Sequence, residues 1–497
     1  MAELSSGVSI SAVSADESAA RIARVPNVVR HVHLIGVAGT AMAALAGMLA
    51  ERGYRVTGSD NQLYEPTASL LAQMRVEVKM GFGAHNLAPA PDLVVVGNVV
   101  TRLNPESQAL MESPLPYLSM PEALWHFFLS AKRVLMIAGT HGKTTSTAMM
   151  AHVLNAAGRD PSMLVGGVAK DFGSNYRLGA GGDFVIEGDE YDTAFFDKRP
   201  KFVHYRPRGA ILTAVEFDHA DIYRDLDHVK SSFRALAEQM ETAGVLAVCA
   251  DSAAALEVTQ VSHARRVTFG LGAGEFRAVA VSAGADGARF SIERGGTTIA
   301  EGLRLPIGGR MNVANALGVA VLLGEFGLGA DEIARGLESF RGVVRRQELL
   351  GEARGVTVVD DFAHHPTAIG ATLAAIAERF AGRRILAAFE PRSNTARRNV
   401  FQAEFAASFD RAARVYLAPV YFKENDPIPS GGRLSVEDLA AEIGRRGPAA
   451  FACASTDDIL ARILADARPG DVALIMSNGP FDNLRERLLA ALGKIPE

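Results

Sequence analysis

Residues 134–145 read Val-Leu-Met-Ile-Ala-Gly-Thr-His-Gly-Lys-Thr-Thr, an apolar run that breaks into a glycine-bounded turn. The apolar run predicts a buried strand, and the residues from Ser146 to Ala157 predict a helix that ends at Gly158. This order is typical of a loop that binds nucleotide phosphates, because backbone N–H groups and the helix N-terminus attract phosphate oxygens. We therefore expect an α/β domain that binds ATP or a similar triphosphate.

Two side chains of this loop indicate its chemistry. Lys143 is expected to reach the terminal phosphates, and the Thr144 hydroxyl is expected to ligate Mg²⁺. The usual pattern, G-x-x-x-x-G-K-[ST], has a glycine where this chain has Ile137, so Gly139 takes that role and the loop is short. A chance Gly-Lys-Thr at a strand–helix junction is the alternative, and the flanking strand and helix argue against it.

The composition limits the class of protein. A chain of 497 residues suggests about three domains, and an apolar content of 48% is enough for sizeable cores. The net charge of −5 argues against nucleic acid as the main partner. No apolar stretch approaches the ~20 residues of a membrane span, so we expect no membrane partner.

Two further features concern the compartment and the start of the chain. The two cysteines, Cys249 and Cys453, are far apart, which offers no disulfide framework and fits a reducing cytosol. Residues 1–28 lack the basic start and the apolar block of a signal peptide. We therefore expect a cytoplasmic protein in which residues 1–28 form a disordered tail.

Residues 29–130 are expected to form an N-terminal Rossmann-like domain. A short strand runs into the turn Gly36-Val37-Ala38-Gly39-Thr40 and then into a helix, and a second strand ends at Asp60. A later strand over 93–96 ends in Gly97-Asn98, and ligands of open sheets bind beyond such strand ends. The turn lacks the full G-x-G-x-x-G spacing, so a tight turn without a ligand explains it equally well.

Residues 131–340 are expected to form a central α/β domain of the P-loop type. Two of its apolar runs end in acidic clusters, Glu187-Gly-Asp-Glu-Tyr-Asp192 and Glu216-Phe-Asp-His-Ala-Asp221. One such cluster is usually only a solvated face. Two at strand ends in one block favour a site for Mg²⁺, which prefers oxygen ligands beside phosphate. Short β-like runs between 258 and 305 predict a small additional sheet.

Residues 341–497 alternate predicted strands and helices, which indicates a C-terminal, Rossmann-like α/β domain with a mostly parallel sheet. Its strand ends carry polar segments at 360–366, 390–394 and 477–479, and these predict a substrate-binding wall. The adjacent His364 and His365 could suggest a transition-metal site. Without a histidine partner at helical spacing, the substrate wall is the simpler interpretation.

Taken in order, these motifs resemble those of the Mur ligase family of peptidoglycan enzymes, from about residue 29 to the end. The matching segments are 139–145, 187–190, 218–221, 312–315, 340–348 and 360–367. The resemblance implies a three-domain α/β ligase that uses ATP and Mg²⁺. In that chemistry, ATP phosphorylates the lactyl carboxylate of UDP-N-acetylmuramate, and an amine attacks the acyl phosphate.

Two members of the family begin with a glycine-turn domain of this kind. One joins L-alanine to UDP-N-acetylmuramate, and the other joins the recycled tripeptide L-alanyl-γ-D-glutamyl-meso-diaminopimelate to the same acceptor. The segments 189–207, 97–106 and 389–395 resemble the second. The alanine-adding enzyme tends to have His-Arg-Tyr where this chain has Arg392-Ser393-Asn394. The tripeptide ligase is therefore favoured, and the L-alanine ligase is the alternative.

The resemblance also assigns roles to residues. It implies ATP binding by Gly139, Thr140, His141, Gly142, Lys143, Thr144, Thr145, Asn312, Asn315 and one hinge arginine, taken as Arg345 rather than Arg341 or Arg346. It implies metal binding by Thr144, Glu187 and His219, and catalysis by Lys143, Glu187 and His219. It implies UDP-sugar binding by Gly36, Val37, Ala38, Gly39, Thr40, Asp60 and Asn98, and peptide binding by Asp360, His364, Arg392, Ser393 and Asn394.

Two positions depart from the family pattern. Met311 stands where the family often has a histidine, and Lys230 is the nearest candidate for the carboxylated lysine of several members but is given no role. Functions of other classes explain only parts of the chain. A dinucleotide-dependent oxidoreductase explains the first block, and a P-loop regulatory NTPase explains the second. The sequence does not define an oligomeric state.

Overall fold

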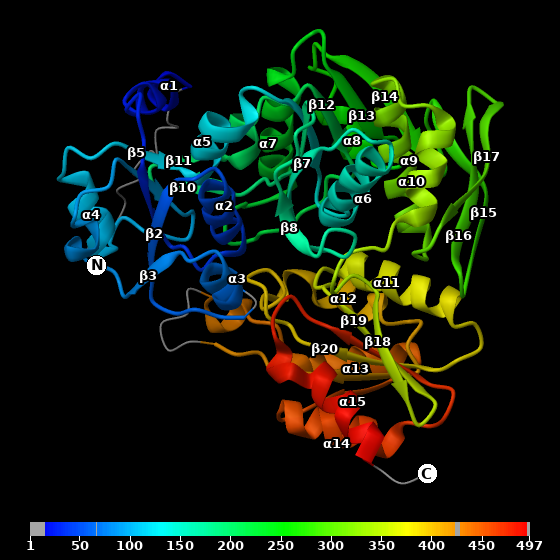
Figure 1. Ribbon diagram of the computed structural model, residues 1–497. Helices are drawn as coiled ribbons and strands as arrows, with labels where there is room; N and C mark the ends of the chain where they lie inside the picture. The colour runs from blue at the N-terminus through cyan, green and yellow to red at the C-terminus, as the bar shows by residue number, and fades with distance from the viewer. Residues whose placement is uncertain (1–14, 66, 423–427, 495–497) are drawn as a thin grey trace, which may run out of the picture.

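The chain folds into three α/β domains, which follow one another from blue through green to red in Figure 1. The structure is a computed structural model that describes residues 15–65, 67–422 and 428–494. The C-terminal domain lies below the other two in this view, with helix α11 (Pro366–Arg379) on the side that faces the central domain. The predicted three-domain α/β class is confirmed.

The N-terminal sheet has the strand order β3-β2-β1-β4-β5, and all its neighbouring strands are parallel. Its strands are β1 (His31–Ile35), β2 (Arg55–Asp60), β3 (Glu77–Met80), β4 (Leu93–Val96) and β5 (Tyr117–Ser119). Its helices are α2 (Thr40–Glu51), α3 (Thr67–Gln73), α4 (Pro105–Met111) and α5 (Met120–Leu124). The strand order reverses between β1 and β4, where ligands of Rossmann-like sheets bind.

The central sheet has the order β17-β16-β15-β14-β13-β12-β6-β9-β7-β8. Its strands are β6 (Arg133–Ala138), β7 (Ser162–Ala169), β8 (Ser174–Arg177), β9 (Asp183–Gly188), β12 (Gly209–Leu212), β13 (Val245–Cys249), β14 (Arg265–Gly270), β15 (Phe276–Gly284), β16 (Gly287–Arg294) and β17 (Thr297–Leu305). Its helices are α6 (Lys143–Ala156), α7 (Leu226–Gln239), α8 (Ala253–Val258), α9 (Arg310–Glu325) and α10 (Ala330–Ser339). A separate hairpin pairs β10 (Asp192–Ala194) with β11 (Asp197–Pro200).

The position of β6 in this sheet brings the functional segments together. It lies between β9 and β12 and is parallel to both, so the two acidic clusters flank the phosphate loop at the same sheet edge. The small additional sheet predicted between 258 and 305 does not form. Strands β15, β16 and β17 instead extend the central sheet as an antiparallel meander, because β15 pairs with β14.

The C-terminal sheet has the order β18-β19-β23-β20-β21-β22, with only β18 antiparallel to its neighbour. Its strands are β18 (Glu348–Ala353), β19 (Val356–Asp361), β20 (Ile385–Phe389), β21 (Arg414–Leu417), β22 (Ala449–Ala452) and β23 (Val472–Met476). Besides α11, its helices are α12 (Gln402–Ser408), α13 (Val436–Arg446), α14 (Thr456–Asp466) and α15 (Leu484–Lys494). Its predicted mostly parallel sheet is confirmed.

The hydrophobic cores show which domains are joined most closely. One apolar cluster continues from the N-terminal sheet, through Val32 and Leu45, to Tyr176 and Phe184 of the central domain. The two clusters of the C-terminal domain contain only that domain's residues. Because apolar burial is the main stabilising term, the first two domains are held to each other more firmly than the third domain is held to them.

The predicted disordered tail is wrong for part of its length. Residues Ala15–Ala23 form helix α1, in which Arg21 Nη2 lies 2.7 Å from Glu122 Oε1 and Ser18 Oγ donates to the same oxygen at 2.6 Å. Glu122 is buried and needs a counter-charge, which explains why this polar segment is ordered. Residues 1–14 of the predicted tail lie outside the described residues.

Within the described residues, no helix has the length and apolarity that crossing a membrane requires.

Candidate active site

Two glycines shape the loop between β6 and α6. The φ angles of Gly139 and Gly142 are +122° and +81°, in the left-handed region that favours glycine. A Cβ atom on Gly142 would lie 2.5 Å from Asn315 Oδ1, so this position also requires the absence of a side chain. Thr213, just after β12, fixes the other side of the loop, because its hydroxyl donates to the His141 carbonyl at 2.6 Å.

Lys143 begins α6, three residues earlier than the sequence predicts, and its ammonium group is buried. Its Nζ donates to the Gly139 carbonyl at 2.7 Å and to Glu190 Oε2 at 2.9 Å. Burial alone would lower the pKa of Lys143, but Glu190 and its acidic neighbours raise it above its usual value. Burial would raise the pKa of Glu190, but Lys143 and His219 lower it to about 2. The lysine is therefore a fixed positive charge at the start of α6.

Glu187, at the end of β9, lies against the same loop. Its Oε2 accepts from Thr144 Oγ1 at 3.3 Å, and its Oε1 accepts from the Gly166 amide at 2.5 Å. Burial, and then the charge of Asp189, raise the pKa of Glu187 to about 7. A half-buried carboxylate beside a hydroxyl is a donor set that suits a hard cation such as Mg²⁺, and a bound cation would favour its ionised form.

His219 approaches from the segment after β12, with a left-handed φ of +53°. Its Nε2 lies 3.5 Å from Glu190 Oε1 and 3.8 Å from Asp218 Oδ2. Burial lowers the pKa of His219, but the carboxylates of Glu190 and Asp218 raise it overall. The loop, β9 and β12 thus bring Lys143, Thr144, Glu187 and His219 into one cluster.

The hinge before the C-terminal domain adds an arginine, but not the expected one. Arg346 Nη2 lies 3.4 Å from Thr144 Oγ1, whereas the guanidinium of Arg345 bonds to Asp360 Oδ2 at 3.0 Å and to the Ser477 carbonyl at 2.7 Å. The structure therefore places Arg346 beside the phosphate loop, and directs the predicted Arg345 toward Asp360 and Ser477 instead. The reason is the left-handed backbone at Arg345, with φ +61°, which the sequence does not signal.

Comparison with known proteins supports what this geometry indicates. Three family models match residues 31–131, 137–323 and 345–479, described as "Mur ligase family, catalytic domain", "Mur ligase middle domain" and "Mur ligase, glutamate ligase domain". The chain belongs to the Mur ligase family. It is therefore an ATP-dependent ligase of a family that acts in peptidoglycan metabolism.

Individual relatives of this Mur ligase are similar along nearly its whole length. The UDP-N-acetylmuramate–L-alanyl-γ-D-glutamyl-meso-2,6-diaminoheptandioate ligases of Escherichia coli K12 and Haemophilus influenzae are 38% and 36% identical, covering 94% and 93% of this chain and 99% of each relative. The UDP-N-acetylmuramate–L-alanine ligase of Rubrobacter xylanophilus is 35% identical and covers 93% of this chain and 100% of its own. The crystal structure of a murein peptide ligase from Psychrobacter arcticus is similar with a TM-score of 0.70 and 34% identity, over 94% of this chain and 100% of that one.

In this Mur ligase, one of the two asparagines of α9 faces the phosphate loop and the other supports it. Asn312 is buried and donates to the Gly308 carbonyl at 2.8 Å, and its Oδ1 accepts from Asn315 Nδ2 at 3.4 Å. Asn315 faces Gly142. Lys230, the nearest candidate for a carboxylated lysine but given no such role, pairs with Glu257 at 2.7 Å.

The glycine turn of the N-terminal domain lies at the reversal point of the sheet. Gly36 has a φ of +83°, and the Ala38 amide donates to Asp60 Oδ2 at 2.9 Å, so Asp60 holds the turn in place. Gly39 and Thr40 are exposed at the start of α2, and Asn98 is exposed after β4. The Val37 side chain is buried, so Val37 can contribute only backbone atoms to a site at this turn.

Of the expected peptide-binding residues, the structure places Asp360 elsewhere. Its carboxylate is buried and pairs with Arg345 at 3.0 Å and with Arg485 at 3.1 Å, which corrects the expectation that Asp360 forms part of an exposed substrate-binding wall. His364 is half-buried and lies near Asp218, which opposes the lowering of the pKa of His364 by burial.

The remaining expected peptide-binding residues lie after β20. The Arg392 side chain is 54% exposed, and its nearest acidic partner, Glu390, is 3.6 Å away. Ser393 accepts from the Ala396 amide at 3.0 Å, as a turn residue does. Asn394 donates to Asp221 Oδ2 at 2.7 Å and thereby joins the third domain to the second.

Three residues at the loop received no individual role from the family resemblance: Glu190, Glu216 and His365. Glu190 balances Lys143, and its place in the acidic run 187–192 is the signal that could have identified it. Glu216 and His365 meet His141 beside the loop. That contact joins three segments far apart in the chain, so no sequence pattern announces it.

Proposed function

We propose that this ligase joins L-alanyl-γ-D-glutamyl-meso-diaminopimelate to UDP-N-acetylmuramate and consumes ATP in the process. The two relatives named for that reaction, at 38% and 36% identity along nearly the whole chain, support the choice of substrates. The convergence of Lys143, Glu187 and His219 at the edge of the central sheet is the observation that carries the chemistry, because acyl-phosphate formation requires a site for phosphoryl transfer.

ATP would bind at the loop 139–145. The Lys143 ammonium would hold the β- and γ-phosphates in exchange for part of its contact with Glu190. Arg346, beside Thr144, would add a second positive charge that can bind phosphate oxygens with two donors. Asn312 and Asn315 would lie along the nucleotide, and Asn315, which packs against Gly142, would keep the loop in its binding conformation.

Mg²⁺ would be held by Thr144 and Glu187, with His219 near a second cation. The pair of oxygen donors fits the first ion, and a bound cation would offset the burial that raises the pKa of Glu187. Divalent cations neutralise the charge that spreads over a transferring phosphoryl group. Asp218 would orient His219, because its carboxylate oxygen Oδ2 lies 3.8 Å from Nε2 of the imidazole ring.

The sugar nucleotide would lie on the N-terminal domain, along the turn 36–40, with Asp60 holding the turn and Asn98 at the neighbouring strand end. The tripeptide would lie against the C-terminal domain, where exposed Arg392 is suited to a peptide carboxylate. His364, Ser393 and Asn394 would form the rest of that wall. The amine of the tripeptide would then attack the acyl phosphate, and the tetrahedral intermediate would expel phosphate.

The domain boundaries at 29–130, 131–340 and 341–497 and a cytoplasmic location form part of this proposal. Both cysteines are free, which is consistent with a reducing compartment.

The deciding experiment measures phosphate release from ATP with UDP-N-acetylmuramate present, and compares free L-alanine with the tripeptide. Turnover with the tripeptide alone is the expected result. Turnover with L-alanine would instead support the alternative, which the relative from Rubrobacter xylanophilus keeps open. ATP hydrolysis that is independent of the sugar nucleotide would overturn both and favour a P-loop regulator.

A further inference from the structure

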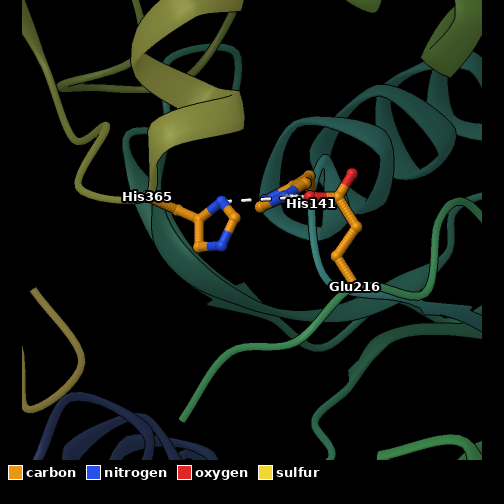
Figure 2. A group of neighbouring side chains, drawn as sticks. All are labelled: His141, Glu216 and His365. Carbon is orange, nitrogen blue, oxygen red and sulfur yellow. Dashed lines mark hydrogen bonds and ion pairs between the residues drawn. The ribbon is translucent and has the colours of Figure 1, made fainter. Parts of the chain in front are cut away.

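We propose that His141, Glu216 and His365 form a binding site for a divalent transition-metal ion of the Zn²⁺ type, which bridges the phosphate loop and the C-terminal domain. The three residues come from the β6–α6 loop, from the segment after β12 and from the start of α11. Figure 2 shows their side chains directed toward one another. This site is separate from the Thr144–Glu187 pair and does not depend on the identity of the substrate.

The distances suit such an ion. His141 Nε2 lies 3.2 Å from Glu216 Oε2, His365 Nδ1 lies 3.9 Å from the same oxygen, and one ligand atom from each residue falls within 4.8 Å of the others. With metal–ligand bonds of about 2.0–2.2 Å, the ligand atoms of a tetrahedral site are about 3.4 Å apart. Small rotations of the side chains would therefore bring all three ligands to bonding distance.

The hydrogen bonds around the cluster prepare it for a metal. His365 Nε2–H donates to the Phe217 carbonyl at 3.2 Å, which leaves the lone pair of Nδ1 on the side of Glu216. A metal-binding histidine usually donates its other ring N–H to a carbonyl or carboxylate in this way. Glu216 Oε2 is supported from outside the cluster, because Thr367 Oγ1 donates to it at 2.7 Å.

One existing contact competes with the metal. The Thr367 amide also points at His365 Nδ1, at 3.3 Å, and caps the start of α11. This hydrogen bond is long, so a metal–nitrogen bond would replace it at small cost.

The chemistry of the donors selects the class of ion. Two imidazoles and one carboxylate suit Zn²⁺, Co²⁺ or Ni²⁺, whereas Mg²⁺ prefers oxygen donors alone. The side chains of His141 and Glu216 are 24% and 36% exposed, so an ion can enter from solvent, while His365 is 6% exposed. Three protein ligands leave a fourth position open, as in zinc sites that bind water.

The position of the site means that a bound ion would connect two domains. His141 belongs to the loop that would hold ATP, and His365 begins the helix of the C-terminal domain that faces it. A bound ion would cross-link the two and oppose the opening of the third domain, whose core is separate from the others. Zn²⁺ would therefore inhibit turnover even when Mg²⁺ is saturating.

The test uses Co²⁺, whose visible spectrum reports tetrahedral nitrogen–oxygen coordination, with the full-length protein in excess Mg²⁺ and without nucleotide. We expect one equivalent of Co²⁺ to bind, to be displaced by Zn²⁺, and to be lost in His365→Ala and Glu216→Gln. His263→Ala, which removes an exposed histidine outside the cluster, should bind as the unmodified protein does.

Two further variants guard against misinterpretation. His365→Cys should retain the ion and add a thiolate-to-Co²⁺ absorption band, because thiolate is a strong ligand and the longer Zn–S bond, about 2.3 Å, offsets part of the shorter side chain. Glu187→Gln should leave Co²⁺ binding unchanged. Absence of stoichiometric binding, or loss of binding in Glu187→Gln but not in His365→Ala, would overturn the proposal and leave the cluster as a hydrogen-bonded contact between domains.

Discussion

Lys143 and Glu190 form a buried charge pair, and each residue depends on the other. Glu190 is only 3% exposed, so its carboxylate relies on the Lys143 ammonium 2.9 Å away for stabilisation. We predict that Lys143→Ala abolishes phosphate release and also lowers the free energy of unfolding by about 3 kcal/mol, because a buried charge loses its partner. Phosphate-release assays and urea unfolding would measure the two effects.

The double variant Lys143→Ala/Glu190→Gln separates these effects. It removes the unpaired charge, so most of the stability should return while phosphate release stays absent. Turnover that survives in the single variant would contradict the role of Lys143 in ATP binding.

Glu187 leads to a prediction about pH, again at the scale of one residue. Its pKa in the folded protein is about 7, above the value of 4.5 for an unperturbed glutamate. The folded protein then binds more protons than the unfolded chain between these two values, so the free energy of unfolding should fall as the pH rises through this window. The decrease should be about 3 kcal/mol at most, given ~1.4 kcal/mol per pKa unit.

Denaturant unfolding in EDTA, at about pH 5 and about pH 8, would measure this decrease. Glu187→Gln, which cannot ionise, should lose this part of the pH dependence. Mg²⁺ should reduce the decrease in the unmodified protein, because a cation stabilises the ionised carboxylate. An unchanged pH dependence in Glu187→Gln would contradict the raised pKa.

At the scale of elements, the turn from β6 into α6 depends on Gly142. A side chain there would meet both a left-handed φ of +81° and the Asn315 amide. We predict that Gly142→Ala raises the KM for ATP at least about tenfold and costs about 1–3 kcal/mol of stability, the usual cost of a strained backbone position. Initial rates at varied ATP concentration and thermal unfolding would measure both changes.

Gly158, just after α6, is a matched control. Its φ is +72°, but a Cβ atom on it would meet nothing within 4 Å. Gly158→Ala should therefore cost about 1 kcal/mol through the backbone alone and leave the KM for ATP unchanged. If Gly142→Ala and Gly158→Ala changed the KM for ATP equally, then the missing side chain of Gly142 would not be what shapes the phosphate loop.

The elements also show what could be read from the sequence. A continuous apolar run predicted β4 with its observed bounds, because a strand buried on both faces needs no alternation. The antiparallel β15–β17 were recognised as β-like, but their attachment to the central sheet was not. That attachment depends on the pairing of β14 with β15, and a local sequence pattern does not encode which strand pairs with which.

At the scale of the whole molecule, the limits of sequence reasoning lie where domains meet. The family motifs predicted the phosphate loop and its acidic neighbours, since these lie on adjacent strands of one sheet. They did not distinguish Arg345 from Arg346, because left-handed backbone at Arg345 and Gln347 decides which guanidinium faces Thr144. Nor did they predict the meeting of His141 with His365, which exists only once the third domain has docked.

Helix α1 contacts both of the first two domains, so its loss should destabilise both. Arg21 Nη2 lies 2.7 Å from Glu122 Oε1 in the N-terminal domain and 3.6 Å from Asp197 Oδ2 in the central domain. Asp197 has its own partners in Arg199 and His204, at 2.7 Å and 3.1 Å. Glu122 is fully buried and receives its main counter-charge from Arg21, which opposes the raising of its pKa by burial.

We therefore predict that Arg21→Ala lowers the free energy of unfolding by about 3–5 kcal/mol, the usual cost of leaving one member of a buried ion pair unpaired. Arg21→Ala/Glu122→Gln should be more stable than Arg21→Ala, because the neutral amide needs no counter-charge. Arg24→Ala, which changes an exposed arginine one turn further on, should have no measurable effect. If differential scanning calorimetry gave the same melting temperature for Arg21→Ala as for Arg24→Ala, then α1 would contribute only surface contacts. The expected order of the variants would instead make helix α1 part of the interface between the first two domains, because Arg21 pairs with an acidic residue of each.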